Sequence, residues 1–195
     1  HNARRAKSPM FNVVGEHASW HLPYDPLLAM DIEALAGSVS AWHRTVKTPE
    51  AFGRDTREAS AKALSGKIAT LMAPSDFQMA AFTGDDREPV GQGESSPGVD
   101  SAKIEQAAAL LARKKRCALV LGGLALSEKG LLAAARIRAK TGCDLFYDTF
   151  PARLEQGAGL PDIYRIPYLP EMALEALKPY DAVLCLGTRA PVAFF

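Results

Sequence analysis

The chain has 195 residues, of which 48% are hydrophobic and 23% are charged, and its formal net charge is +1. This composition is typical of a globular protein with one large or two small domains. A net charge near zero gives no reason to expect a nucleic-acid or anionic-membrane partner. No apolar run approaches the roughly 20 residues of a membrane span.

The first part of the chain predicts alternating strands and helices, since short apolar runs alternate with stretches of helical periodicity. Asp25 is a candidate N-cap, with Pro26 in the first helical turn and Gly37 as the stop. In chain order we expect a strand over 10–14, a polar and aromatic loop over 16–24, a helix over 25–37, a strand over 39–44, a helix from 48 and a strand over 67–73.

Asp, Glu, Gly, Pro and Ser dominate residues 83–101, which predicts an interdomain linker. We then expect a helix over 102–115, a strand over 118–121, a helix after Ser127, a strand over 143–147, an irregular segment over 155–168, a helix over 170–177 and a strand over 181–186. This alternation favours an α/β protein of two three-layer α/β/α units with mainly parallel sheets. The chain begins without Met and ends directly after a strand, so we expect both units to be truncated.

Glycines follow two of the predicted strands in the second unit. Gly122 and Gly123 end one strand, and Gly187, Thr188 and Arg189 follow another. The carboxyl edge of an open α/β sheet is where such folds bind ligands, and an arginine there can pair with a phosphate in bidentate fashion. A bound FAD, ADP or NAD is one interpretation. We favour the other, an empty edge that serves only packing, because the Gly-x-Gly-x-x-Gly spacing is absent.

Two groups of residues are candidate metal ligands. His17 and His21 lie four residues apart in the first loop, but Glu16 is the only nearby carboxylate and no third ligand has suitable spacing, so we predict no metal. The three cysteines, Cys117, Cys143 and Cys185, are odd in number and lie in apolar runs. They indicate reduced core thiols in a cytoplasmic protein, not disulfides or a zinc site.

Several of these stretches resemble one family. Residues 8–16, the loop up to 25, and residues 67–76 are similar to the second half of the pyrimidine-binding domain of thiamine diphosphate-dependent enzymes. The linker and the helix from 104 onward resemble the start of their central domain. The strongest likeness is to acetolactate synthase large subunits and benzoylformate decarboxylase-like proteins, supported by residues 148–153 and 190–195.

The resemblance implies a half pyrimidine-binding domain over 1–82, a linker over 83–101 and a central Rossmann-like domain over 102–195 that is incomplete at its C-terminus. It implies a parent enzyme that acts on a 2-oxo acid by decarboxylation or carboligation, with thiamine diphosphate and Mg²⁺, as a homo-oligomer (dimer or tetramer). In some members the central domain holds FAD or ADP.

The resemblance also places the first loop beside the active-site cleft, where Glu16, His17 and His21 are candidates and the histidines could act as proton shuttles. Loop surface or a subunit contact is the alternative for them. Leu27 and Leu28 match a paired leucine that lines the substrate pocket in benzoylformate decarboxylase-like members. From the sequence alone they form the first turn of the predicted helix over 25–37.

Two family features fall outside these residues. The glutamate that starts ylid formation would precede His1, and the Gly-Asp-Gly…Asn segment that holds magnesium and diphosphate does not occur in the sequence. We therefore expect a piece of an enzyme that neither binds the cofactor nor is active by itself. The alternative, from another functional class, is a non-catalytic nucleotide-binding module that uses the edge from Gly122 to Arg189.

Overall fold

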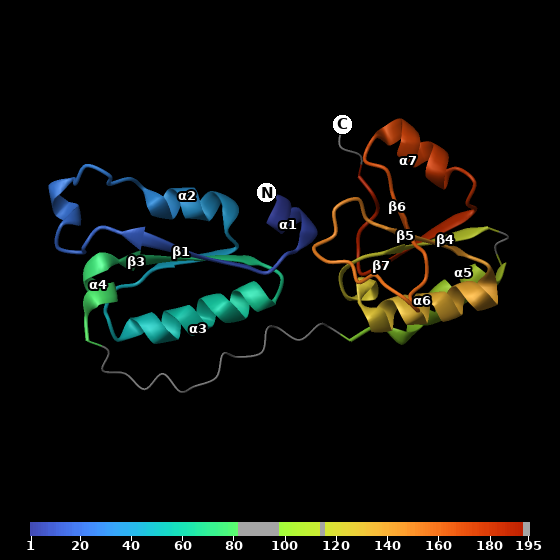
Figure 1. The fold of residues 1–195 in the computed structure, drawn as a ribbon, viewed down its shortest axis with the longest axis horizontal. Helices are drawn as coiled ribbons and strands as arrows, with labels where there is room; N and C mark the ends of the chain where they lie inside the picture. Colours follow the sequence, from blue (N-terminus) through green and yellow to red (C-terminus); the bar gives the residue numbers. More distant parts are fainter. Residues whose placement is uncertain (82–97, 114–115, 193–195) are drawn as a thin grey trace. The chain divides into compact units, whose positions relative to one another are not determined.

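The computed structural model describes residues 1–81, 98–113 and 116–192. The chain divides into two compact units, His1–Ser96 and Pro97–Phe195 (Figure 1). Most of the predicted linker over 83–101 lies outside the described residues. None of the helices in the described residues is both long and apolar enough to cross a bilayer.

The first unit contains a parallel sheet of three strands in the order β1-β3-β2. The central strand, β3 (Ile68–Pro74), is buried along its whole length, as expected for an apolar strand covered on both faces. It pairs with β1 (Met10–Glu16) on one side and with β2 (Trp42–Thr45) on the other. β1 and β2 are therefore edge strands in the described part of this unit.

Helices cover the two faces of this sheet. α3 (Ala51–Leu64) packs Ala59 and Ala63 against Ala69 on one face. On the other face, beneath α2 (Ile32–Val39), Thr70 accepts a hydrogen bond from the Asn12 side chain at 3.1 Å. Short helices complete the unit, namely α1 (Asn2–Ala6), η1 (Leu22–Tyr24) and α4 (Ser75–Met79).

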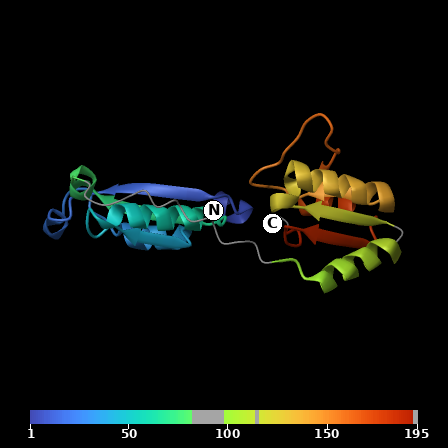
Figure 2. The ribbon, with the colours of Figure 1, turned by 90° about the horizontal axis from the view of Figure 1, so that it is seen from below.

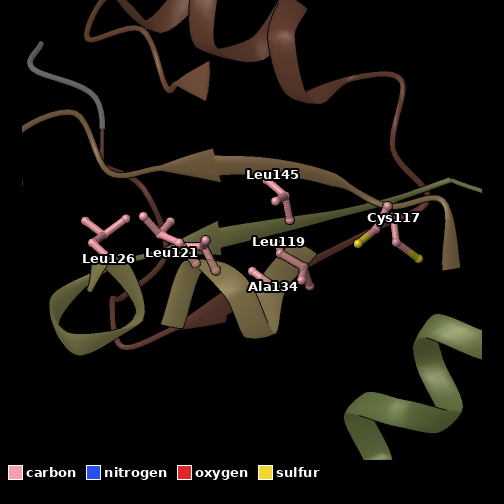
Figure 3. Close-up of a cluster of buried hydrophobic side chains, with 8 residues drawn as sticks. Cys117, Leu119, Leu121, Leu126, Ala134 and Leu145 are labelled. Carbon is pink, nitrogen blue, oxygen red and sulfur yellow. The ribbon is translucent and has the colours of Figure 1, made fainter. Parts of the chain in front are cut away.

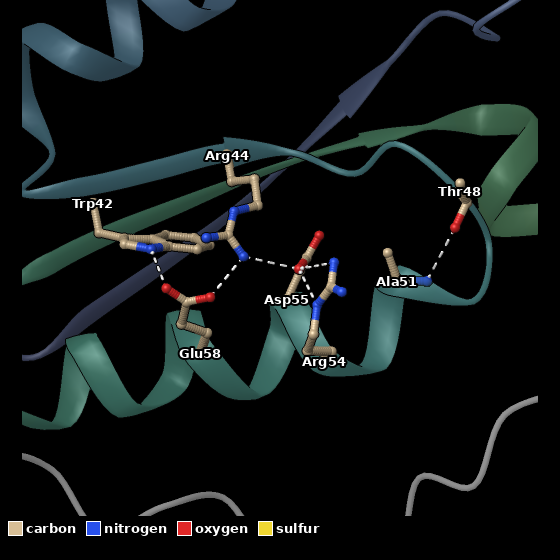
Figure 4. A network of polar contacts seen from close by, with 7 residues as sticks. All are labelled: Trp42, Arg44, Thr48, Ala51, Arg54, Asp55 and Glu58. Atoms are coloured by element: carbon tan, nitrogen blue, oxygen red, sulfur yellow. Dashed lines mark hydrogen bonds and ion pairs between the residues drawn. The ribbon is translucent and has the colours of Figure 1, made fainter.

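A polar network ties α3 to the edge strand β2 (Figure 4). The Arg44 guanidinium on β2 donates to the carboxylates of Asp55 and Glu58 on α3. The Trp42 indole donates to the other oxygen of Glu58 at 3.0 Å, and Arg54 donates to Asp55 at 3.1 Å. Every carboxylate in the network thus has a charged or hydrogen-bonding partner, which offsets the cost of its burial.

The helix predicted over 25–37 is wrong in its first half. Asp25 has a left-handed backbone (φ 50) after η1, a geometry that cannot begin an α-helix. The helix begins only at Ile32, because Asp31 caps it by accepting a hydrogen bond from the Ala34 amide at 2.9 Å. Leu27 and Leu28 consequently lie in the preceding turn, outside any helix.

The second unit contains four parallel strands in the order β6-β5-β4-β7. They are β4 (Cys117–Leu121), β5 (Asp144–Tyr147), β6 (Tyr164–Arg165) and β7 (Ala182–Leu186). The helices are η2 (Gly123–Leu126), α5 (Ser101–Arg113), α6 (Glu128–Thr141) and α7 (Pro170–Leu177). Short β6 lies in the segment predicted to be irregular.

The core of the second unit has two faces. On one face, Leu119 and Leu121 of β4 pack with Leu131 and Ala134 of α6 and with Leu145 (Figure 3). α5 and α6 both lie on this side, in front of the strands in Figure 2. On the opposite face, Ala118, Val120 and Phe146 pack against α7. The mainly parallel α/β fold predicted from the sequence is confirmed.

Candidate functional site

The loop that follows β1 carries most of the candidate residues. Glu16 is the last residue of β1, at the carboxyl end of the sheet, and it is half-buried. Its Oε1 atom accepts a hydrogen bond from the backbone amide of His17 at 2.7 Å. This local contact fixes the direction in which the chain leaves the strand.

His17 and His21, which were expected in the same loop, lie close together. Their ring centroids are 5.8 Å apart, and His21 also contacts Trp20 edge-on at 5.3 Å and Tyr24 at 6.5 Å. The result is an aromatic cluster with two imidazoles at the end of β1. In the part of the chain that the structure describes, no three His, Cys, Asp or Glu side chains are grouped so as to hold a metal ion.

Ser19 anchors this loop to α4. Its amide donates to Asp76 Oδ1 at 3.0 Å, and its hydroxyl donates to Asp76 Oδ2 at 2.5 Å. Desolvation raises the pKa of Asp76, but the hydrogen bonds from Ser19 outweigh it and hold this pKa below its usual value. Because α4 directly follows β3, the contact holds the loop at the carboxyl edge of the sheet. No sequence pattern indicates this contact. In the sequence, Asp76 is only the last residue of Pro74-Ser75-Asp76, the polar turn residues that end the predicted strand over 67–73.

Leu27 and Leu28 are exposed, at 98% and 75% of their surface. Three more large apolar side chains in the same loop region, Trp20, Tyr24 and Met30, are exposed as well. A group of large apolar side chains presented to solvent by one loop is typical of a binding surface. All five sequence-predicted site residues of the first unit lie between the end of β1 and the start of α2, namely Glu16, His17, His21, Leu27 and Leu28.

The glycine edge of the second unit is closed by its own backbone. The Gly122 amide donates to the Leu186 carbonyl at 2.9 Å, which joins the ends of β4 and β7. A Cβ atom on Gly122 would lie 2.6 Å from the Thr188 Cβ, and one on Gly187 would overlap the Gly122 carbonyl. These two glycines are thus explained by the close approach of two chain segments.

The remaining candidates at this edge are arranged around Asp148, which follows β5. Thr188 donates its hydroxyl to Asp148 Oδ2 at 3.2 Å, and the Asp148 amide donates to the Leu121 carbonyl. Burial, with the nearby Asp148 charge, raises the pKa of the Cys185 thiol. Arg189 and Gly123 are exposed. The Asp148 carboxylate and the Thr188 hydroxyl are thus hydrogen-bonded to each other.

No family model matches the chain. A Mycobacterium tuberculosis (strain ATCC 25618 / H37Rv) protein named "Putative acetolactate synthase large subunit IlvX" is 39% identical over 196 residues, covering 100% of this chain and 37% of that protein.

Two solved structures share the fold over 100% of this chain, both with a TM-score of 0.74. One is described as "a putative thiamin diphosphate-dependent enzyme isolated from Mycobacterium smegmatis", at 20% identity over 38% of its chain. The other is the Rhodococcus jostii RHA1 thiamine diphosphate-dependent 4-hydroxybenzoylformate decarboxylase, at 16% identity over 39% of its chain.

The chain spans less than two fifths of the length of each of these relatives. Within that span, the sequence match and the fold match both run along the whole chain. The resemblance predicted from the sequence is therefore confirmed: this chain is related along its whole length to part of an acetolactate synthase large subunit-like protein and has the fold of thiamine diphosphate-dependent enzymes.

Proposed function

We propose that this chain is part of a thiamine diphosphate-dependent enzyme that decarboxylates a 2-oxo acid or joins its decarboxylated fragment to an acceptor, as acetolactate synthases do. The observation that carries the proposal is the 39% identity to an acetolactate synthase large subunit-like protein along the whole chain. The intact enzyme would use thiamine diphosphate with Mg²⁺ and would assemble as a homo-oligomer in the cytoplasm. The absence of disulfides among the three cysteines is in keeping with a reducing compartment.

The two units have different proposed roles. Residues 1–82 form the second half of a pyrimidine-binding domain, and residues 102–195 form part of the central domain, joined by the linker 83–101. The first unit would supply one wall of the active-site cleft through the loop after β1. The second unit would be structural, because the Gly122–Leu186 hydrogen bond and the Gly122–Gly187 contact fill the switch point of its sheet.

Within the cleft wall, Leu27 and Leu28 would contact the apolar part of the substrate. Both are exposed, and they follow the loop segment that Ser19 anchors to Asp76. His17 and His21 would hold or pass a proton at the end of β1, since imidazole is the side chain that ionises near neutral pH. Glu16 would orient His17 through the amide of that residue.

We expect that the 195-residue chain does not hold magnesium and thiamine diphosphate by itself. The described residues present no group of metal ligands, and no Gly-Asp-Gly occurs in the sequence. A diphosphate–metal pair needs oxygen ligands in a defined geometry. We therefore expect calorimetric titration of the 195-residue chain with thiamine diphosphate and Mg²⁺ to show no tight binding. A low-micromolar dissociation constant would contradict this part of the proposal.

The reaction itself is tested on the intact gene product supplied with thiamine diphosphate and Mg²⁺. We expect it to release carbon dioxide from a 2-oxo acid such as pyruvate or benzoylformate. Replacing Leu28 by Ala should lower kcat/KM for the larger substrate by about tenfold, in line with the free energy of a lost apolar contact. Leu64→Ala is the matched control, because Leu64 is also exposed but lies on α3. Equal activity of the Leu28→Ala and Leu64→Ala variants would argue against the pocket role.

Nucleotide binding at the glycine edge is the rival function, and the wild-type chain tests it. Thermal-shift measurements with FAD, ADP, NAD and coenzyme A should show no saturable change in Tm. A ligand present at a hundred times its dissociation constant adds about 2.7 kcal/mol to the free energy of unfolding, which such measurements detect. A saturable shift that is lost in Arg189→Ala would favour the nucleotide-binding function.

A further inference from the structure

All three cysteines are reduced in the structure, and two of them lie side by side in the core of the second unit. Cys117 is the first residue of β4, and Cys143 directly precedes β5. These strands pair in parallel, and Ala118 lies opposite Asp144. The residues one position earlier are the two cysteines, which therefore lie opposite each other as well. Both belong to the cluster of buried side chains drawn in Figure 3, so their thiols face the same side of the sheet.

The spacing of paired strands suits a disulfide bond. Neighbouring strands lie about 4.8 Å apart, and the Cα atoms of disulfide-bonded cysteines are usually about 4.4–6.8 Å apart. The Cβ atoms of side chains that face the same way begin at about the strand spacing, whereas a disulfide brings them to roughly 3.8 Å. Closing the bond therefore needs a movement of about 1 Å at one strand end. A disulfide that forms with such strain is more easily reduced than a relaxed one.

The chain before Cys143 has room for this movement. Cys143 lies outside β5, and its amide makes a long hydrogen bond of 3.4 Å to the Thr141 hydroxyl. Gly142 has a left-handed backbone (φ 71), and a Cβ atom there would meet no atom within 4 Å. A small shift at this strand end thus meets no packed neighbour at Gly142.

The packing around the pair comes from the second unit itself. β4 lies between β5 and β7, and β5 lies between β4 and β6, so neither strand is at an edge of the described sheet. Cys117 and Cys143 are 5% and 1% exposed, yet each directly follows an exposed residue, Arg116 or Gly142. The two thiols thus lie just beneath the surface, where a small neutral oxidant such as hydrogen peroxide reaches them during local opening.

We propose that Cys117 and Cys143 form a reversible oxidation site, at which hydrogen peroxide converts the two thiols into a disulfide that links β4 to β5. The thiolate of one cysteine attacks a peroxide oxygen, the O–O bond breaks, and the released hydroxide takes up a proton and leaves as water. The second thiolate attacks the sulfur of the sulfenic acid so formed, the S–O bond breaks, and a second water leaves in the same way.

The electrons balance in this sequence. The two thiols together lose two electrons and two protons, and one hydrogen peroxide gains them to become two water molecules. A dithiol reductant reverses the change by thiol–disulfide exchange. The second cysteine also protects the first, because a sulfenic acid that is captured as a disulfide is not oxidised further to the irreversible sulfinic and sulfonic acids.

Cys185 provides a comparison within the same unit. It lies on β7, and its side chain packs with the opposite face of the core, away from the face that holds the other two cysteines. Its neighbour on β4 is Val120. Burial, with the nearby Asp148 charge, raises the pKa of the Cys185 thiol, which disfavours the reactive thiolate. We therefore expect Cys185 to remain a thiol while the pair is oxidised.

Peroxide treatment of the folded, intact gene product, followed by peptide mapping with mass spectrometry, tests the proposal. We expect the peptides that contain Cys117 and Cys143 to be joined, with the loss of two hydrogen atoms, and the Cys185 peptide to keep its thiol. Dithiothreitol should return both joined cysteines to thiols. Circular dichroism before and after treatment verifies that the protein stays folded.

Alanine variants separate the pair from a single reactive cysteine. In Cys143→Ala, peroxide should carry Cys117 on to sulfinic and sulfonic acids, so its recovery as a thiol after dithiothreitol should fall at least about tenfold relative to wild type. Cys117→Ala should do the same to Cys143, which keeps the test open if one variant folds poorly. Cys185→Ala is the matched control and should leave the disulfide and its recovery unchanged.

Several results would overturn the proposal. One is a folded protein in which Cys117 and Cys143 stay thiols at a peroxide concentration that oxidises glutathione in the same solution. Another is a disulfide that includes Cys185. A third is a link between Cys117 and Cys143 that forms only in urea, because the two thiols would then meet through unfolding and not through the pairing of β4 with β5.

Discussion

Arg44 on β2 donates a hydrogen bond to the buried carboxylate of Asp55 on α3, with Nη1 2.9 Å from Oδ1 (Figure 4). The Asp55 side chain is only 2% exposed, so its charge depends on protein partners instead of water. The same guanidinium lies 5.0 Å above the ring of Trp42. Arg44 therefore couples the edge strand of the first unit to the helix beneath it.

Replacing Arg44 by Met should lower the free energy of unfolding of the first unit by about 1.5–3 kcal/mol, the range for a hydrogen bond to a charged group. The change leaves the Asp55 charge with Arg54 as its remaining cation, and Arg54 is 68% exposed. Urea unfolding, followed by tryptophan fluorescence, measures this loss in the free energy of unfolding, because both tryptophans, Trp20 and Trp42, lie in the first unit. Arg54→Met is the control and should cost less than about 1 kcal/mol. Equal losses would contradict the assignment.

Glu58 should make the stability of the first unit depend on acid pH. Burial raises the pKa of Glu58, but hydrogen bonds from Arg44 and Trp42 outweigh it and hold the pKa below the usual 4.5. A carboxylate with a lowered pKa stabilises the folded state above its unfolded pKa and loses that contribution as the pH falls through the folded pKa. The stability difference between wild type and Glu58→Gln should thus be constant near neutrality and shrink below pH 4.5. Urea midpoints measured across this range test it, and a constant difference down to about pH 3 would count against it.

Six of the seven strands in the described residues were predictable, because buried parallel strands are short apolar runs such as Ala118–Leu121 in β4. The expectation of an irregular segment over 155–168 missed β6, whose two residues are exposed and form no apolar run. The start of α2 was not predictable. Asp25 and Asp31 have the same capping chemistry, and Pro26 favours Asp25 on local grounds. The η1 turn selects Asp31, because it leaves Asp25 in the left-handed region, and that turn has no clear signal in the sequence.

The candidate site also has a part that the sequence predicts and a part that it does not. The position of Gly122 directly after β4 follows from the strand assignment, whereas Glu16, expected in the loop over 16–24, is the last residue of β1. The bond between Ser19 and Asp76 joins residues far apart in the chain, and neither residue has a local pattern that indicates it. Contacts between residues far apart in the chain depend on how helices and strands pack. They therefore cannot be predicted from local patterns in a single sequence.

Tyr180 predicts a response to alkaline pH in the second unit. Its hydroxyl donates to Asp144 Oδ2 at 2.6 Å, and burial together with this carboxylate raises the pKa of Tyr180 to about 12. A group with a raised pKa stabilises the fold below its unfolded value of 10.0 and loses that contribution as the pH rises through the folded value. Tyr180→Phe should cost about 0.5–1.5 kcal/mol at neutral pH. The difference from wild type should vanish between pH 10 and 12, measured by chemical unfolding. Absorbance titrations of the phenolates in wild type and in Tyr180→Phe give an independent check. If the group that is missing from the variant ionises near pH 10 in the wild type, the raised pKa of Tyr180 is contradicted.

The glycine pair at the end of β4 and β7 gives the last prediction, through two alanine substitutions with matched backbone geometry. Gly187 and Gly142 both have left-handed backbones, with φ of 70 and 71. A Cβ atom on Gly142 would meet open space, whereas one on Gly187 would overlap the carbonyl of Gly122. Gly142→Ala should therefore cost only the left-handed strain, about 1–2 kcal/mol. Gly187→Ala should cost about 1–3 kcal/mol more, because the two strand ends must move apart.

Scanning calorimetry measures both variants, and the tryptophan fluorescence transition of the first unit, which should not move, serves as the internal control. Equal losses for Gly142→Ala and Gly187→Ala would mean that the strand ends are not in close contact in solution. The switch point of the sheet would then be open, and the argument for a structural second unit would lose its main support. A larger loss for Gly187→Ala is the outcome expected if Gly187 serves the packing of β7 against β4.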